Sequence, residues 1–397
     1  MRVFVSEFIC GGGLSGEQLP DSLQREGRAM LWAVVDDLLQ ISDCRVSTTL
    51  DARLTQEVPL PDSSRCRIEI VASAEAEQRQ FHELAATSDA VLVIAPETDG
   101  QLADRVRRVL SFGVKSLNCS PEAIELCGDK LRLARHFEDH SLVTLPTQIV
   151  DWSLSRPVAG VGEAPTPENL NTLSAGGGEA LTPATRFENR EDGFNSSPAW
   201  VIKPRDGAGS WLTLRVRTDS PEEWQRAAMA YAAAGVAHKA LIQPFIEGLP
   251  LSVGCHCQHD GEVEVFPIGQ QRLSRDFEYL GGSIPASLPA STATAVQELV
   301  RRACATIPGL NGHIGFDLLL PDADPTRPLI VEINPRLTTS YVGYRRLSAS
   351  NLAARWLHGA NLLKDANISP RSLSPLEWSP RRIEFDASGN TRFDDAP

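Results

Sequence analysis

The chain has 397 residues, 42% of them hydrophobic and 22% charged, which is typical of a globular protein with two or three domains and a substantial core. Its formal net charge of −13 argues against a nucleic-acid partner or an anionic membrane surface, because both favour basic proteins. No stretch approaches the roughly twenty apolar residues of a membrane span, and the eight cysteines lack the spacing of a disulfide framework.

Residues 1–120 alternate between strand and helix signals, which predicts a parallel, doubly wound α/β sheet. The chain opens on a strand-like run without the layout of a signal peptide, so we expect a cytoplasmic protein. Helical periodicity runs from Leu23 to Leu39 and from Leu102 to Leu110. The predicted strands are Val3–Ile9, Cys44–Thr49, Ile68–Val71, Ala90–Ile94 and Val114–Leu117.

The first predicted strand ends in the glycine run Cys10-Gly-Gly-Gly13. Its backbone amides could approach a ligand at the carboxyl edge of the sheet, but the spacing is not a dinucleotide fingerprint. A plain flexible turn explains the run equally well. Glu7 and Glu97 also lie near strand ends, and each alone is interpreted as a solvated acid.

A helix is predicted to begin at Ser120-Pro-Glu122 and to extend to about Glu138, because serine is a good N-cap and proline suits the first helical position. Lys130 lies inside this helix, where a lysine is usually only solvated. Residues 153–198 then change to a Gly-, Pro- and Ser-rich composition, which predicts a flexible insertion.

Order returns with a strand at Ala199–Pro204 that carries Lys203, a glycine-rich loop at Arg205–Ser210 and a second strand at Trp211–Val216. Small residues let successive amides point at a phosphate, and the lysine adds a positive charge. Unlike in a P-loop, the lysine precedes the glycines. A tight turn after an exposed lysine is the alternative. The small residues of the loop are Gly207, Gly209 and Ser210.

A helix at Pro221–Ala234 leads to a strand at Ala240–Gly248, where backbone groups beside Pro244 and two apolar neighbours, Phe245 and Ile246, suit the edge of an adenine ring.

A hairpin around Asp260-Gly261 follows, and its first strand contains Cys255-His-Cys257. In a strand the side chains of the two cysteines lie on the face opposite to that of His256. No second ligand pair has zinc-finger spacing either, so a metal is disfavoured there.

The late segments Gly315–Leu320 and Leu329–Arg336 read as short apolar strands interrupted by polar residues. Glu332 and Asn334 project together because residues i and i+2 share a face, and a neighbouring strand could place Asp317 beside them. Two carboxylates and an amide oxygen suit a hard cation that also holds phosphates. Polar residues on a solvated face are the alternative, which the apolar neighbours disfavour.

Arg272 and Arg336 are the candidate cations for an anionic substrate, because arginine grips carboxylate and phosphate through two hydrogen bonds. Helices are expected at about Ser291–Ile307 and Asn351–Lys364. The polar tail at 366–397 receives no assignment.

The order of a helix lysine, a Lys-Pro strand with a glycine loop, a hinge strand and then Asp followed by Glu-x-Asn resembles the ATP-grasp superfamily. Within it, Ser6-Glu-Phe-Ile-Cys-Gly-Gly-Gly13, Ile94-Ala-Pro-Glu97 and the segment Glu332–Tyr341 resemble the archaeal tyramine–L-glutamate ligases of methanofuran synthesis. The resemblance implies a Rossmann-like pre-ATP-grasp domain at 1–120 and an α+β ATP-grasp fold of two subdomains at 121–365.

The resemblance also implies roles for single residues. Lys130 and Lys203 would hold phosphates under the glycine loop, and Gln243 to Ile246 would contact adenine, with Glu247 the candidate for the ribose. The metal ligands would be Asp317, Glu332 and Asn334. The implied cofactors are ATP and Mg2+, with Mn2+ as its substitute.

The implied activity is an ATP-dependent carboxylate–amine ligase that forms an amide through an acyl phosphate, with the γ-carboxylate of glutamate and tyramine as substrates. Two alternatives stay open: a ligase for other amino acids or amines, and a nucleotide-binding regulatory protein without turnover. The expected partners are small molecules, an amino acid and an amine, with a homodimer as an open option.

Overall fold

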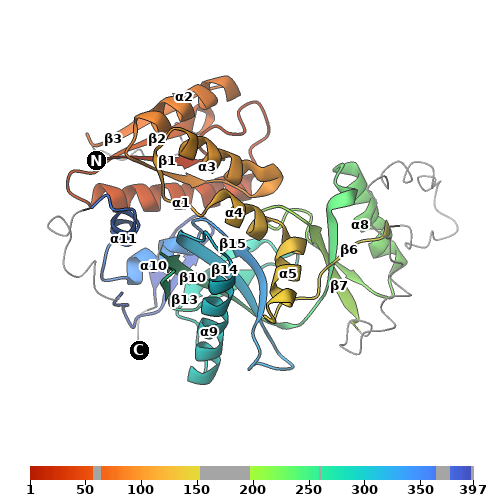
Figure 1. The fold of residues 1–397 in the computed structure, drawn as a ribbon. Helices are drawn as coiled ribbons and strands as arrows, with labels where there is room; N and C mark the ends of the chain where they lie inside the picture. The colour runs from red at the N-terminus through yellow and green to blue at the C-terminus, as the bar shows by residue number, and fades with distance from the viewer. Residues whose placement is uncertain (57–63, 153–196, 259–260, 364–375, 395–397) are drawn as a thin grey trace.

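The computed structural model describes residues 1–56, 64–152, 197–258, 261–363 and 376–394. It contains a parallel sheet at the top of the view, a large antiparallel sheet below it and a smaller antiparallel sheet on the right (Figure 1). The predicted insertion at 153–198 lies outside the described residues except for its last two positions. Among the described helices, none has both the length and the apolar character that crossing a membrane requires.

The N-terminal sheet has the order β3-β2-β1-β4-β5 with every neighbouring pair parallel, so the prediction of a doubly wound sheet is confirmed. Helix α1 packs on the face that carries Val3 and Val5, whereas α2 and α3 pack on the face of Phe4. The strands are β1 (Arg2–Glu7), β2 (Arg45–Asp51), β3 (Cys66–Val71), β4 (Ala90–Ile94) and β5 (Lys115–Ser116). The helices are α1 (Asp21–Leu39), α2 (Ala74–Thr87) and α3 (Gln101–Ser111), with the 3-10 turns η1 (Ala52–Leu54) and η2 (Thr98–Gly100).

Helix α2 is the element of this domain that the sequence analysis does not predict. Only one side of it is buried, through Phe81, Leu84 and Ala85 among others, and the rest is charged, polar or alanine, which hides the apolar period. The local signal is at its start, where the side chain of Ser73 accepts a hydrogen bond from the amide of Ala76.

The predicted helix from Ser120 to Glu138 is two helices, α4 (Pro121–Gly128) and α5 (Lys130–Asp139). Asp129 between them is extended, and its carboxylate accepts hydrogen bonds from the amides of Leu131 and Arg132. Aspartate favours such N-caps over helix interiors, so it starts a new helix there. Lys130 is therefore the first residue of α5 and does not lie inside a longer helix.

The smaller antiparallel sheet, which we call the lid, has the order β6-β9-β7-β8 and is covered by α8. Its core contains Trp200, Ile202 and Tyr231. The second strand begins later than predicted, at Leu214, and the predicted strand Ala240–Gly248 ends at Pro244. The elements are β6 (Gln148–Ile149), β7 (Ala199–Pro204), β8 (Leu214–Arg217), α8 (Pro221–Ala233), η6 (Ala237–Lys239) and β9 (Ala240–Pro244).

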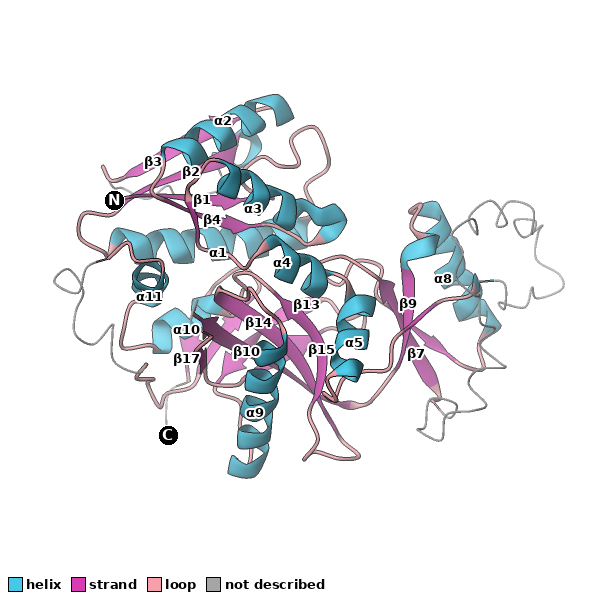
Figure 2. Cartoon of the chain, in the orientation of Figure 1, coloured by secondary structure: helices cyan, strands magenta, loops and turns pink. Residues whose placement is uncertain are grey.

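The large sheet, which we call the palm, lies below the parallel sheet in Figure 2. Its strand order is β15-β14-β10-β12-β13-β16-β17, with β11 paired to β10. Helices α4 and α9 pack on one face of it, and α10 and α11 belong to the core on the other face. The predicted hairpin is confirmed, because β10 and β11 pair with Cys255 opposite Val265. The strands are β10 (Gly248–Cys257), β11 (Val263–Val265), β12 (Gly269–Leu273), β13 (Tyr279–Ile284), β14 (Gly312–Pro321) and β15 (Leu329–Asn334).

The C-terminal part of the palm differs most from the prediction. The expected helix Asn351–Lys364 is α11 (Leu352–Gly359), and α9 (Ala290–Thr306) matches its prediction closely. A further helix, α10 (Tyr341–Leu347), was not predicted. The tail is not without structure, because β16 (Ile383–Asp386) pairs with β13 and β17 (Thr391–Phe393) pairs with β16.

Candidate functional site

A cavity of about 350 Å3 lies between the lid and the palm, with part of its wall contributed by α1 and α5. This volume lies in the range of small-molecule sites in proteins. Every predicted site residue except Arg272 lines it. The predicted residues in its wall are Lys130, Lys203, Gly207, Gly209, Ser210, Gln243, Phe245, Ile246, Glu247, Asp317, Glu332, Asn334 and Arg336.

Two neighbouring palm strands bring the predicted oxygen donors together. The antiparallel register of β14 and β15 sets Asp317 opposite Glu332, and a bulge follows Asp317. Asn334, two residues along, donates from Nδ2 to Asp317 Oδ2 at 3.1 Å. Gln271 of β12 donates from Nε2 to the other oxygen of Asp317 at 2.6 Å. The predicted grouping of two carboxylates and an amide on adjacent strands is therefore present.

The two carboxylates sit close enough to disturb each other. Burial, together with the negative charge of Glu332, raises the pKa of Asp317 to about 7. Burial also acts to raise the pKa of Glu332, but the ammonium groups of Lys130 and Lys203 outweigh it and lower that pKa to about 2. The pair therefore holds less negative charge than two free carboxylates, and a divalent cation would relieve the repulsion between them.

Both predicted lysines face this acidic pair. The ammonium of Lys130 lies 3.5 Å from a carboxylate oxygen of Glu332 and donates to the carbonyl of Gly207 at 3.0 Å. Lys203 is buried in β7, and burial lowers its pKa to about 8 against the opposing charge of Glu332. Lys130 thus bridges the palm to the glycine loop of the lid.

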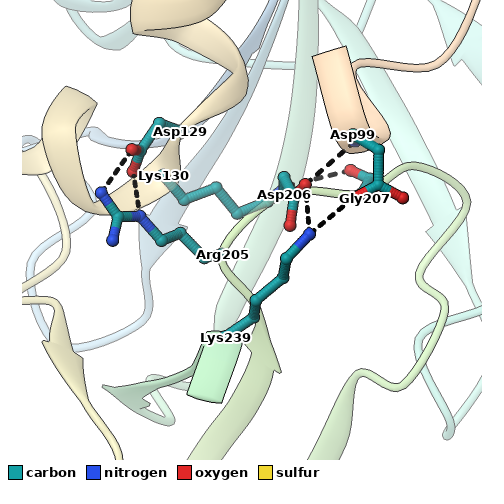
Figure 3. A network of polar contacts seen from close by, with 7 residues as sticks. All are labelled: Asp99, Asp129, Lys130, Arg205, Asp206, Gly207 and Lys239. Atoms are coloured by element: carbon teal, nitrogen blue, oxygen red, sulfur yellow. Dashed lines mark hydrogen bonds and ion pairs between the residues drawn. The ribbon is translucent and has the colours of Figure 1, made fainter. Parts of the chain in front are cut away.

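The root of the glycine loop is held by a network of ion pairs (Figure 3). Arg205 donates through two nitrogens to the carboxylate of Asp129, at 2.8 and 2.6 Å. Lys239 bridges Asp206 and Asp99 at 3.0 and 2.7 Å, and the amide of Asp99 also donates to Asp206. The loop is therefore attached at once to α5, to the lid and to the N-terminal domain.

Gly209 shows why the loop needs small residues. Its φ of 69° lies in the left-handed region, and a Cβ there would meet Leu23 of α1 at 2.6 Å. The loop thus packs against the N-terminal domain with no room for a side chain at this position.

The segment after β9 forms an apolar part of the cavity wall. Phe245 lies 6.3 Å from Phe277 between ring centroids, and the guanidinium of Arg215 lies 3.7 Å above the ring of Phe245. Within the described residues, the amide and carbonyl of Ile246 make no hydrogen bond. A flat heterocycle with polar edges would fit there.

Two further predicted residues, Gln243 in β9 and Glu247 after it, have partners within the protein. Gln243 donates from Nε2 to the hydroxyl of Thr147 at 2.8 Å. Glu247 has an exposed side chain whose carboxylate lies 3.5 Å from Arg215. Glu247 thus stands at the rim of the cavity, where a ribose hydroxyl could reach it.

The two predicted arginines have different environments. Arg336 lines the cavity and forms a two-bond ion pair with Glu97 of the N-terminal domain, at 2.9 and 3.4 Å. The interpretation of Glu97 as a solvated acid was wrong, because its side chain is 6% exposed. Arg272 does not line the cavity, and its guanidinium donates to the backbone carbonyl of Phe385 at 3.1 Å.

Glu26 of α1 lines the cavity, and the sequence analysis does not single it out. Its carboxylate accepts a hydrogen bond from Thr339 at 3.0 Å. Burial raises its pKa, and within the described residues no lysine or arginine forms an ion pair with it. A single acid on an amphipathic helix gives no sequence signal, so only the fold reveals it.

The glycine run after β1 does not reach the cavity. Glu7 is buried there, and its carboxylate accepts hydrogen bonds from the amides of Ile9 and Cys10. A Cβ on Gly11 would meet the carbonyl of Glu7 at 2.1 Å. The run is therefore a tight, packed turn, and the interpretation of Glu7 as a solvated acid was wrong.

Residues 44–124 match the family model of the pre ATP-grasp 3 domain, and residues 175–340 match the model of the ATP-grasp domain. The chain thus contains a pre-ATP-grasp domain and an ATP-grasp domain. The predicted family and fold are thus confirmed, and the enzyme class of this family is the ATP-dependent carboxylate–amine ligase. ATP and Mg2+, the predicted cofactors, are those that the family uses. The domain limits 1–120, 121–365 and 366–397 stay predictions.

Three similar proteins illustrate the range of this superfamily. The chain is 24% identical over 274 residues to a tyramine–L-glutamate ligase of Methanocaldococcus fervens. The matched region covers 69% of this chain and 66%, just under two thirds, of that protein. An ATP-grasp protein of Archaeoglobus fulgidus has a TM-score of 0.63 and 20% identity, and the match covers 97% of this chain and 92% of that one.

The third is a dimer of the biotin carboxylase domain of the Hydrogenobacter thermophilus 2-oxoglutarate carboxylase, solved with MgADP, ADP and bicarbonate. Its TM-score is 0.64 at 14% identity, over 92% of this chain and 72% of that chain. At these identities the two structures establish the fold alone.

The residues in the cavity of this ATP-grasp protein fit its two cofactors. Donors that are all oxygen, from Asp317, Glu332 and Asn334, suit Mg2+, and a cation would relieve the repulsion between the two carboxylates. Two ammonium groups and a glycine loop beside them suit a polyphosphate. The roles of the single residues stay predictions.

Proposed function

We propose that this protein is an ATP-dependent ligase that joins a carboxylate to an amine, with the γ-carboxylate of glutamate and tyramine as its substrates. The observation that carries the proposal is the meeting of two lysines with a half-buried Asp–Glu–Asn group in one cavity. The similarity to a tyramine–L-glutamate ligase supports the choice of substrates.

Carboxylates do not acylate amines at neutral pH, because an oxide is a poor leaving group. Bound ATP would supply its γ-phosphoryl group to the carboxylate, which would give an acyl phosphate and release ADP, while Mg2+ would neutralise the charge of the phosphates. The amine would then displace phosphate and lose a proton to leave an amide. The protein's own contribution is to position groups and to neutralise charge.

The residues around the cavity divide this work. Lys130 and Lys203 offset the charge of the phosphates, and the glycine loop covers them. Asp317, Glu332 and Asn334 hold the cation. Arg336 is held in place by Glu97, so its remaining nitrogen–hydrogen groups present a fixed cation to the acid substrate.

Glu26 suits the amine substrate. An amine enters as an ammonium ion at neutral pH and must lose a proton before it attacks. Glu26 carries an acceptor oxygen in the cavity wall and has no cationic partner among the described residues, so it can bind the ammonium and take its proton. Its raised pKa makes it a better base than an exposed glutamate.

The test is turnover with defined substrates. Purified protein, ATP and Mg2+ are combined with glutamate and a panel of amines that includes tyramine, and released phosphate and the mass of the amide are measured. The proposal expects phosphate release that requires both glutamate and an amine. ATP binding without turnover for any pair would support the non-catalytic alternative, and another preferred acid or amine would support the other ligases.

A homodimer is part of the proposal, supported by the dimer of the 2-oxoglutarate carboxylase domain. Light scattering after size-exclusion chromatography tests it, and a mass of one chain, 43.2 kDa, at assay concentration would exclude it.

A further inference from the structure

Three thiols from two elements meet in the core on the α9 side of the palm, apart from the ATP cavity. Cys255 and Cys257 lie on the same face of β10, and Cys304 comes from α9. Their sulfur atoms all lie within 4.8 Å of one another, and those of Cys255 and Cys304 are 3.9 Å apart. All three side chains are buried.

These distances suit a single metal ion at the centre of the three sulfurs. A metal–sulfur bond of about 2.3 Å places three sulfurs around a central ion about 4 Å apart. Among the described residues the group contains sulfur donors only, because His256 points to the other face of β10, where it lies opposite His313. Sulfur donors select soft ions such as Cu+ and Zn2+ over the magnesium of the ATP cavity.

The cluster can be reached from solvent. A second cavity, of about 670 Å3, has Cys257 and Cys304 in its wall, together with Cys119. The thiol of Cys119 exchanges hydrogen bonds with the backbone of Asn311. An ion could therefore enter without unfolding of the core.

We propose that Cys255, Cys257 and Cys304 bind one soft metal ion, Zn2+ or Cu+. The ion ties α9 to β10, the strand that pairs with β14 and sets Ser252 opposite Asp317. Binding thus stabilises the central strands of the palm, because a ligand that binds only the folded state shifts unfolding. This site is independent of the ligase activity.

The test titrates the reduced, chelator-treated full-length protein under anaerobic conditions. One arm adds Zn2+ against a chromophoric zinc chelator, and the other adds Cu+ against bicinchoninate. One equivalent should bind per chain in at least one arm, and the melting temperature should rise in that arm. Co2+ should give the thiolate-to-metal charge-transfer absorption of a sulfur site.

Cys257→Ala is the informative variant, and Cys66→Ala, in β3, is the matched control. Alanine keeps the core apolar, and circular dichroism confirms that each variant is folded. Cys257→Ala should weaken binding by at least about tenfold and remove the thermal shift, whereas Cys66→Ala should change neither. Cys304→Ala repeats the test from α9 if Cys257→Ala does not fold.

The absence of one-to-one binding in both arms, with the wild-type protein folded, would overturn the proposal. So would equal loss of binding in Cys66→Ala and Cys257→Ala. In either case the three thiols serve only as apolar packing.

Discussion

Lys130 gives the sharpest test of the ATP site, because its ammonium contacts both the palm and the glycine loop of the lid. The change is Lys130→Met, which keeps the length and helix propensity of the side chain but removes its charge. In the wild type the ammonium donates to the carbonyl of Gly207 and lies 3.5 Å from Glu332, and its side chain is 11% exposed. Solvent can replace little of this interaction.

The expected loss follows from the kind of hydrogen bond that is removed. A hydrogen bond that involves a charged group contributes about 1.5–3 kcal/mol. If Lys130 makes one such bond to a phosphate in the transition state, Lys130→Met lowers kcat/KM for ATP by roughly 10- to 150-fold. The assay follows ADP release at saturating acid and amine substrates, and calorimetry measures the Kd of ATP separately.

Arg132→Met is the matched control. Arg132 lies on the same helix with an exposed side chain, and its loss changes the net charge by the same amount. We expect its kcat/KM to stay within about twofold of the wild type. The reasoning is wrong if Lys130→Met, with an unchanged melting temperature, also stays within twofold.

Four further changes test other parts of the molecule. Glu332→Gln should abolish turnover at any Mg2+ concentration while circular dichroism stays unchanged, and normal turnover would remove the cation assignment. Lys203→Ala should lower kcat/KM for ATP at least about tenfold, which corresponds to a lost phosphate contact of about 1.4 kcal/mol or more. Glu26→Gln should raise KM for the amine and leave KM for ATP unchanged; a change in KM for ATP alone would contradict the role in amine binding. Burial raises the pKa of Glu7 from 4.5 to about 7, so between these values the folded protein keeps a proton that the unfolded chain has lost. The contribution of this proton to stability is therefore complete below pH 4.5 and is lost as the pH rises through 7, by about 3 kcal/mol in total. Between pH 5 and pH 8, the free energy of unfolding in urea should fall less for Glu7→Gln than for the wild type.

The palm strands with the oxygen donors could be predicted because their signal is local. Alternation along Leu329–Asn334 fixes the shared side of Glu332 and Asn334. Apolar neighbours then predict a buried side, where a carboxylate needs a partner, and the structure leaves Glu332 and Asn334 half-buried. The same holds for Lys203, because the strand and the glycine loop after it are adjacent in sequence.

The pairing of Arg336 with Glu97 could not be predicted, because 239 positions separate the two residues. Glu97 alone was interpreted as a solvated acid near the end of a strand, and Arg336 was predicted only as a cation for the substrate. Only the packing of the N-terminal domain on the palm makes the arginine a fixed group in the cavity and the acid a buried one. The loss of Glu97 would leave Arg336 as a buried cation without its partner, which is costly.

The cysteine cluster also depends on a contact between residues that are distant in sequence. Alternation along β10 correctly places Cys255 and Cys257 on one face, and that argument also removes His256 from the set. A metal was disfavoured because no second ligand pair follows at a regular spacing. The third thiol, Cys304, comes from α9, which meets β10 only because it packs on this face of the folded palm. Spacing rules describe ligands that one local unit supplies, so they cannot exclude a site whose last donor a distant helix provides.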